Sequence, residues 1–193
     1  RMPEAWNLLY EAGTFTEFGE QRALGHTSLD NTIYHKGALD MKKEIAEARA
    51  KLDFINDPEA TAKDEQLQGM DISCDAVIIF AERHADLAEK MAAEEKDEKR
   101  KAELLKIADV CRWVPAHAPR DFWEAVQMYW FVHLATITEL NGWDAMSPGH
   151  LDQHLGSFYE KGLADGTLTR DEAKELLACL FIKVNNTPAP PKV

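Results

Sequence analysis

Helical periodicity runs through most of this 193-residue chain, and no stretch alternates polar and apolar residues for long enough to predict a β-strand. Residues 122–140 are apolar almost all round, which predicts a buried helix. Apolar residues also recur at helical spacing in the ranges 32–54, 63–95, 104–113, 151–164 and 169–184. No repeat and no shift in composition divides the chain. The sequence therefore predicts a mainly α-helical single unit spanning residues 1–193.

Several residues predict where these helices begin and end. Pro58 ends the helix expected over 32–54, because proline lacks a backbone donor and disfavours helical geometry in the residue before it. Asp121 is placed to cap the buried helix that follows it. Thr169 and Glu172 have the spacing of a capping box, which predicts the start of the last helix.

The charge balance excludes some partners. The chain has 22 Lys and Arg residues against 34 Asp and Glu residues, a net charge of −12. Such a surface repels nucleic-acid phosphates and anionic lipids at long range, so we expect neither nucleic acid nor a membrane as a partner. No apolar run approaches the roughly 20 residues of a membrane span, and the start lacks the apolar core of a signal peptide. We expect a cytoplasmic protein.

The three cysteines, Cys74, Cys111 and Cys179, are widely separated and form no Cys-x-x-Cys pair. This spacing predicts neither a disulfide framework nor a cysteine-rich zinc site, and it suits a reducing compartment. His150 and His154 are four residues apart on a predicted helix and could share a metal ion, but no third ligand lies nearby in the sequence. A histidine pair at a helix surface or interface is the simpler interpretation, and we expect no metal.

Two irregular stretches interrupt the helices, at 14–31 and 141–149, and long loops in compact domains are often functional. Arg22 and His26 in the first stretch could converge on an anionic or hydroxylated ligand. Trp143 and Asp144 in the second offer a flat apolar wall and a hydrogen-bond acceptor. Ordinary surface loops remain the alternative for both stretches. The candidate substrate-binding residues are Arg22, His26, Trp143 and Asp144.

The run from Glu139 to Gln153, ELNGWDAMSPGHLDQ, resembles the Glu-x-Asn-Gly…Ser-x-Gly-Arg-x-Asp-Gln stretch of glycyl radical enzymes related to pyruvate formate-lyase. Residues 111–127 resemble the Arg-x-Val-Pro…Pro-x-x-Phe-x-Glu-Ala-x-Gln segment of the same family. Residues 25–39 look like its substrate-side loop and the Gly-Leu helix that follows. The three matches are collinear over nearly the whole chain, so the resemblance rests on their combination.

The resemblance implies an α/β barrel that encloses two finger loops. One loop bears a cysteine that becomes a thiyl radical, and the other bears a glycine that stores the radical after a radical-SAM activating enzyme installs it. Both loops are expected C-terminal of the matched region. The chain would then be an interior, helical segment of a larger pyruvate formate-lyase-type domain, with no catalytic residue of its own. Cys74, Cys111 and Cys179 should not inherit the thiyl role.

For the whole enzyme, the resemblance implies a homodimer and a lyase reaction. A thiyl radical abstracts hydrogen from a small polar substrate, and the adjacent substituent leaves. Arg22 would pair with a charged substrate group and His26 would hydrogen-bond a hydroxyl or oxyanion. Trp143 and Asp144 would shape the pocket. They stand where pyruvate formate-lyase has small residues, in a stretch one residue longer, so a pyruvate site is not expected.

The run 185–193 looks more like the carbon–sulfur lyase branch, which acts on small sulfonates such as isethionate, than like the diol dehydratases. Carbon–sulfur cleavage is therefore the first expectation, and a diol or hydroxylated-amine dehydratase is the alternative within the family. A further alternative, from another class, is a non-catalytic helical scaffold or interaction module. His150, where many relatives have arginine, is a second departure from the family pattern.

Overall fold

The computed structural model describes residues 8, 9, 11, 12, 31–139 and 148–185. Helices account for nearly all of the regular structure, and no strand occurs in these ranges, as the sequence predicts. The elements, in chain order, are the 3-10 helix η1 (Thr32–Tyr34) and the α-helices α3 (Ala38–Arg49), α4 (Ala60–Glu94), α5 (Glu98–Trp113), α6 (Phe122–Glu139), α7 (Leu151–Asp165) and α8 (Arg170–Asn185).

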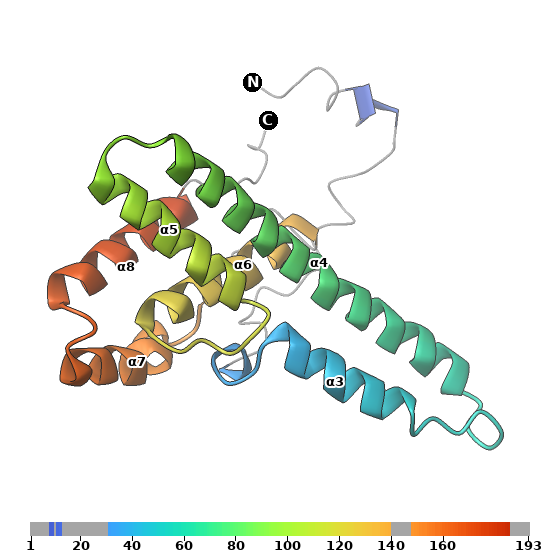
Figure 1. Cartoon of the computed structure of the whole chain (residues 1–193). Helices are drawn as coiled ribbons and strands as arrows, with labels where there is room; N and C mark the ends of the chain where they lie inside the picture. Colours follow the sequence, from blue (N-terminus) through green and yellow to red (C-terminus); the bar gives the residue numbers. More distant parts are fainter. Residues whose placement is uncertain (1–7, 10, 13–30, 140–147, 186–193) are drawn as a thin grey trace.

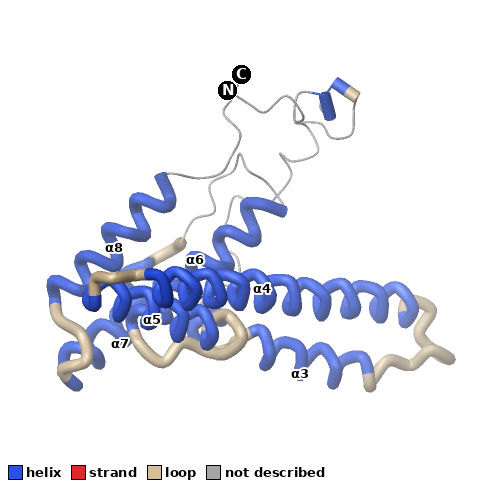
Figure 2. Tube along the Cα trace, turned by 45° about the horizontal axis from the view of Figure 1, so that its top comes forward, coloured by secondary structure: helices blue, strands red, loops and turns tan. Residues whose placement is uncertain are grey.

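Helix α4 is the longest element, with 35 residues, and extends about 50 Å at the usual rise per residue. Its N-terminal half lies beside α3 and its C-terminal half lies beside α5 (Figure 1). In Figure 2, α3 and the neighbouring half of α4 project as an arm from the cluster formed by α5 to α8. The chain therefore has a two-helix arm joined to a compact helical body.

Helix α6 is the centre of that body and contacts η1, α4, α5, α7 and α8. Its apolar sequence explains this position, because a helix without a polar face can be stable only when surrounded. The main core gathers buried residues from α6 itself and from η1, α5, α7 and α8, namely Ile33, Tyr34, Val110, Val114, Phe122, Ala125, Val126, Met128, Tyr129, Leu155, Ala173 and Leu180. The prediction of a buried helix is confirmed.

A seam of alanines brings α4 close to α5 and α6. Ala81, Ala85 and Ala88 recur at four- and three-residue spacing and are almost fully buried. They form a second core cluster with Ala108 and Cys111 of α5 and with Phe131 of α6. Small side chains let two helix backbones approach closely, so this seam sets how α4 crosses α5.

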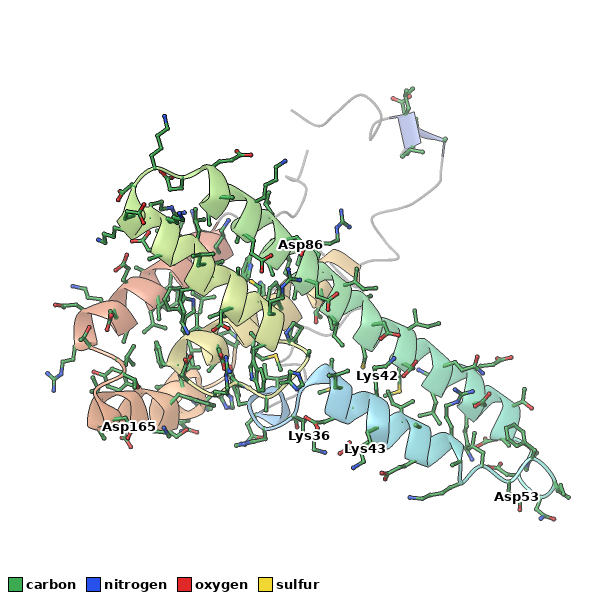
Figure 3. The ribbon with its side chains drawn as sticks, in the orientation of Figure 1. Lys36, Lys42, Lys43, Asp53, Asp86 and Asp165 are labelled. Atoms are coloured by element: carbon green, nitrogen blue, oxygen red, sulfur yellow. The ribbon has the colours of Figure 1, made fainter. Side chains whose placement is uncertain are left out.

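Ion pairs link the helices at the surface. Lys42 of α3 lies 2.8 Å from the carboxylates of both Asp71 and Asp75 of α4. Arg112 of α5 pairs with Asp86 and Glu89 of α4. Lys42 of α3 and Asp86 of α4 are labelled in Figure 3. These pairs are largely exposed, so they contribute more to orienting the helices than to stability.

The structure confirms both predicted helix starts. The backbone N–H of Glu124 donates to Asp121 Oδ1 at 2.9 Å, so Asp121 caps α6. Before α8, the Glu172 backbone N–H donates to Thr169 Oγ1 at 3.2 Å, and the Glu172 carboxylate accepts from the Thr169 backbone N–H at 2.7 Å. This reciprocal pair is the predicted capping box.

The single helix predicted over residues 32–54 is wrong. The structure has η1, a break at residues 35–37, and then α3, which ends at Arg49 well before Pro58. A Cβ atom at Gly37 would lie 2.2 Å from the Ala116 carbonyl oxygen and 2.4 Å from His117 Cα. The chain breaks here because Gly37 packs directly against the backbone that follows α5, a tertiary contact with no local sequence signal.

In the part of the chain that the structure describes, no helix is both long and apolar enough to span a membrane.

Candidate substrate-site anchors

The four residues predicted to bind substrate, Arg22, His26, Trp143 and Asp144, lie outside the residues that the structure describes, in the ranges 13–30 and 140–147. The structure does describe the residues that directly follow each of these ranges, from 31 and from 148 onward. We call the segments the first segment (13–30) and the second segment (140–147). The first segment leads into η1, and the second leads into α7.

The first segment leads into η1, which is firmly held. The Tyr34 backbone N–H donates to the Asn31 carbonyl at 3.0 Å, and the His35 N–H donates to the Thr32 carbonyl at 3.0 Å. Ile33 and Tyr34 are only 2% and 4% exposed. Their burial fixes the point at which the first segment joins the core.

After η1, the backbone is tied to the turn that follows α5. The Ala38 N–H donates to the Pro115 carbonyl at 2.8 Å, and the Leu39 N–H donates to the Ala116 carbonyl at 3.0 Å. Gly37 supplies the close approach that these hydrogen bonds need, and its own N–H donates to the Asp40 carboxylate at 3.0 Å. Hydrogen bonds therefore hold the chain that follows the first segment, both within η1 and at the start of α3.

The second segment leads into α7 through Gly149, whose φ of +67° lies in the left-handed region. The carbonyl of His150 then accepts from the N–H groups of Gln153 and His154, both at 3.0 Å, which starts the helix. A residue with a Cβ atom would be strained at position 149, so glycine fixes the direction in which the chain enters α7.

The two anchors are in contact with each other. The ring of Tyr34 stacks on the imidazole of His154, with ring centroids 5.5 Å apart and planes inclined by 23°. Phe158, one turn further along α7, lies 6.2 Å from Tyr34. The described elements η1 and α7 therefore lie side by side, although more than 100 residues separate them in the sequence. The predicted pairing of Arg22 and His26 with Trp143 and Asp144 remains a prediction.

A buried polar pair on α6 lies close to this junction. The Tyr129 hydroxyl is 3.1 Å from His133 Nδ1, and both side chains are buried. Burial lowers the pKa of His133, which keeps its imidazole neutral, and raises the pKa of Tyr129 to about 12. The neutral phenol can therefore donate its proton to Nδ1. Tyr129 also raises the pKa of Tyr34, whose largest shift comes from its own burial.

Glu124 is a second buried polar group that the sequence reasoning missed. Its side chain is fully buried, and its carboxylate accepts from the Arg120 backbone N–H at 2.7 Å and from Arg120 Nε at 2.9 Å. The Arg120 guanidinium lies 4.1 Å from the centre of the Trp113 ring. This cluster joins the end of α5 to the start of α6, and it explains the Pro-x-x-Phe-x-Glu segment as a structural motif.

The described residues contain no metal-binding cluster, and burial disfavours the thiolate form of two of the cysteines. His154 stacks on Tyr34, and no group of three or more His, Cys, Asp or Glu side chains is arranged to hold a metal in residues 31–136 and 148–185. Burial raises the pKa of the Cys111 thiol to about 11, which suppresses the reactive thiolate. Cys74 is half-buried, and its pKa is raised mainly by burial as well.

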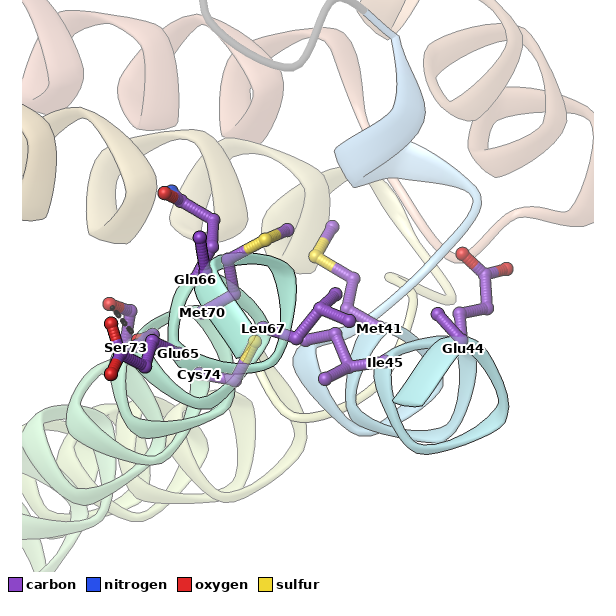
Figure 4. Close-up of a pocket in the computed structure, with 12 residues that line it drawn as sticks. Met41, Glu44, Ile45, Glu65, Gln66, Leu67, Met70, Ser73 and Cys74 are labelled. Atoms are coloured by element: carbon purple, nitrogen blue, oxygen red, sulfur yellow. Dashed lines mark hydrogen bonds between the residues drawn. The ribbon is translucent and has the colours of Figure 1, made fainter. Parts of the chain in front are cut away.

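The arm contains a groove of about 1000 Å³ between α3 and α4. In Figure 4, Met41 and Ile45 of α3 face Leu67 and Met70 of α4, with Cys74 beneath them. The lining is mostly apolar and includes no residue of η1 or α7. Such a wall suits a packing surface better than a site that binds a small polar molecule.

A family model, Pyruvate formate lyase-like, matches residues 1–193, so the chain belongs to this family of glycyl radical enzymes, and the expected family is confirmed. The chain is 55% identical over 192 residues to trans-4-hydroxy-L-proline dehydratase from Clostridioides difficile. This alignment covers 100% of the chain and 24% of that relative.

Other relatives agree on the family and the fold. Isethionate sulfite-lyase from Nitratidesulfovibrio vulgaris is 40% identical over 150 residues, which cover 78% of this chain and 18% of that protein. The crystal structure of the Clostridioides difficile hydroxyproline dehydratase with bound trans-4-hydroxy-L-proline superposes with a TM-score of 0.85 at 55% identity, covering 100% of this chain and 24% of that one. A glycyl radical enzyme from Archaeoglobus fulgidus gives a TM-score of 0.78 at 32% identity, with 95% and 24% covered.

These matches confirm the predicted fold class, a mainly helical part of a glycyl radical enzyme barrel. The chain spans about a quarter of the length of the dehydratase and of the two solved structures. They also correct the order of the two functional expectations: the similarity to a dehydratase is higher and longer than the similarity to a carbon–sulfur lyase.

Proposed function

We propose that this chain is an interior segment of a glycyl radical dehydratase that removes water from a small hydroxylated amine. The observation that carries the proposal is the 55% identity to trans-4-hydroxy-L-proline dehydratase, which extends over both the first and the second segment. The run 185–193 pointed instead to sulfonate cleavage. A resemblance over nine residues weighs less than identity over the whole chain.

Each predicted site residue has a role that suits such a substrate. Arg22 pairs with a substrate carboxylate, which fixes the orientation of the molecule. His26 hydrogen-bonds the hydroxyl that leaves and can supply its proton, so that the group departs as water. Asp144 accepts a hydrogen bond from the amine nitrogen, and Trp143 covers the pocket with an apolar face that excludes water. The radical, when present, supplies abstraction of a hydrogen atom beside the hydroxyl-bearing carbon.

We propose that the whole protein contains further polypeptide beyond this segment, and that its partners are a second copy of itself and an activating enzyme. Large apolar side chains of α4 and α8 are exposed, including Ile72 (67%), Ile79 (54%), Phe181 (60%) and Ile182 (60%). Exposed apolar surface of this extent supports a larger domain that covers it. We place the radical cysteine and glycine in that remaining polypeptide, and we propose a cytoplasmic homodimer that is activated by a radical-SAM enzyme.

The test uses the full-length protein, which its radical-SAM partner activates in the absence of oxygen. Electron paramagnetic resonance measures how much of the protein carries the radical. Activated protein is offered trans-4-hydroxy-L-proline, 1,2-propanediol and isethionate in separate assays. We expect the hydroxylated amine to lose water, with a kcat/KM at least 100-fold above that of the diol. Propanal formation as the main activity would reassign the enzyme to the diol dehydratases.

Carbon–sulfur cleavage is the second candidate, favoured by the isethionate sulfite-lyase relative. Release of sulfite from isethionate as the main activity would establish it in place of dehydration. A protein that acquires a radical but converts none of the three compounds would overturn both candidates, whereas a protein that acquires no radical would overturn the radical mechanism itself.

A further inference from the structure

The loop between α3 and α4, at the end of the arm, presents two large apolar side chains to solvent. Phe54 is 61% exposed, and Ile55, at 92%, is the most exposed large hydrophobic side chain of the described residues. Tight turns are usually built from small and polar residues. Single exposed apolar residues are common on protein surfaces, but two neighbours at the end of a projecting arm mark a contact surface. We call residues 52–59 the tip.

Hydrogen bonds to one aspartate hold the backbone of the tip. Asp53 Oδ1 accepts from the N–H groups of Ile55 and Asn56, both at 3.0 Å, and Oδ2 accepts from Asn56 Nδ2 at 2.7 Å. A loop that is already ordered loses little conformational entropy when it docks. The tip contains three carboxylates and no basic residue. Two of them pair with Lys63 of α4, which leaves the charge of Asp53 unbalanced.

A groove of about 730 Å³ lies between α7 and α8. Its most buried lining residues include Phe122 and Leu155, each 4% exposed, and the half-buried Tyr159 and Leu177 also line it. Gly156 leaves a gap in the α7 side, because no heavy atom lies within 4 Å of the place where a Cβ atom would be. The groove is therefore an apolar surface with room for large side chains.

The charged residues of this groove suit the tip. Arg170 and Lys174 of α8, one turn apart, line it against a single carboxylate, Asp152 of α7. Neither basic side chain has an ion-pair partner within the part of the chain that the structure describes. A basic edge is unusual in a chain with a net charge of −12, and it attracts an acidic tip. The groove between α3 and α4 has only carboxylates among its charged lining residues, so it would repel the tip.

The tip and the groove lie at opposite ends of the molecule. Figure 3 labels Asp53 at the end of the arm and Asp165, the last residue of α7, at the far end of the body, and Figure 2 shows the same separation. The tip therefore cannot reach the groove of its own chain. Two copies that lie antiparallel can each place the tip in the groove of the other, and this reciprocal contact closes a two-fold dimer.

We infer that the tip docks in the α7–α8 groove of a second copy of this chain, with Phe54 and Ile55 against the apolar lining and Asp53 facing Arg170 and Lys174. This inference rests on the proposed homodimer and specifies its interface. It does not depend on which substrate the enzyme converts.

The experiment measures how fast two differently tagged preparations of the full-length protein exchange subunits, both without the radical, by native mass spectrometry. The exchange rate reports dissociation of the dimer. We expect Ile55→Asp to raise this rate at least tenfold, roughly, because a charge replaces an apolar side chain at both contacts. Gly156→Leu should raise it as well, because the leucine fills the groove. Circular dichroism checks that each variant is folded. An unchanged rate in either folded variant overturns the inference.

The charged contact is tested by a matched pair on α8. Lys174→Glu should raise the exchange rate about fivefold, whereas Lys183→Glu, the same change on the opposite face of the helix, should leave it unchanged. Asp53→Asn keeps the acceptor oxygen of the tip and removes only its charge. It should raise the rate in the wild-type background and not in Lys174→Glu. Equal effects of the two lysine variants, or additive effects of the two contact variants, overturn the inference.

Sedimentation of the wild-type protein separates this inference from the proposal beneath it. A monomer overturns the proposed homodimer and the inference together, and leaves the substrate assays unaffected. A dimer whose exchange rate none of these substitutions alters retains the homodimer and overturns this interface. The remaining polypeptide would then be the occupant of the groove.

Discussion

At the level of single residues, His133 makes stability depend on pH in a defined direction. Burial lowers its folded-state pKa, so as the pH falls below about 6.5 the unfolded chain takes up a proton before the folded chain does. The free energy of unfolding therefore decreases on acidification. The contribution of His133 to it is fully present above that pH. Protonation also removes the Nδ1 acceptor used by Tyr129.

We expect His133→Gln to reduce the loss of stability between pH 7.5 and pH 5.5. Glutamine cannot titrate, yet its side-chain oxygen can still accept from the Tyr129 hydroxyl. Urea unfolding of the full-length protein at the two pH values measures the effect. If the variant loses as much stability as the wild type over this range, His133 is not the group responsible.

Arg22 supplies a second prediction at this scale. Replacing it with alanine should raise KM for the hydroxylated amine roughly 10- to 100-fold, because a charge-assisted hydrogen bond to the substrate carboxylate is lost, while kcat changes less. Steady-state kinetics of the activated protein give both constants. Lys43→Ala, which removes one exposed positive charge from α3, is the control and should behave as the wild type.

At the scale of elements, helix type followed from the sequence, and α4, α6, α7 and α8 lie within a few residues of their predicted ranges. Helix α5 begins at Glu98, six residues before its predicted start. The break before α3 was also not predicted, because it depends on contact between Gly37 and residues 116 and 117. The candidate site residues came from side-chain chemistry in two irregular stretches and from the family resemblance, and they stay a prediction because they lie outside the described residues.

Two glycines test this account of the break. Gly37→Ala should destabilise the protein by about 1–3 kcal/mol, because the new Cβ atom would overlap backbone that cannot move aside. Gly69→Ala, inside α4 with no heavy atom within 4 Å of the added Cβ, should instead stabilise by about 0.5–1 kcal/mol through better helix propensity. Chemical denaturation gives both values. Equal effects of the two substitutions would contradict the tertiary origin of the break.

At the scale of the whole molecule, the exposed apolar side chains of α4 predict association when the 193-residue chain is produced alone. Ile72 and Ile79 are seven residues apart, on one face of the helix, and are 67% and 54% exposed. We expect oligomers that grow with protein concentration in size-exclusion chromatography with light scattering. Ile72→Lys combined with Ile79→Lys should shift the chain towards monomer.

The matched control adds the same two charges at the same spacing on another face of α4, through Gln66→Lys and Ser73→Lys, exposed positions at the groove between α3 and α4. It should leave association unchanged. A monomeric wild-type chain at high concentration, or equal rescue by the control, would mean that this face does not drive association.

The contact between Tyr34 and His154 also bears on how relatives of this protein can diverge. With both exits pinned to each other, neither η1 nor α7 can slide to absorb an extra amino acid. Under the proposed function, an insertion or deletion in either segment would then change the lining of the substrate site, because neither anchor can move to absorb it. We therefore expect the gain or loss of a single codon in these two stretches to change substrate selectivity.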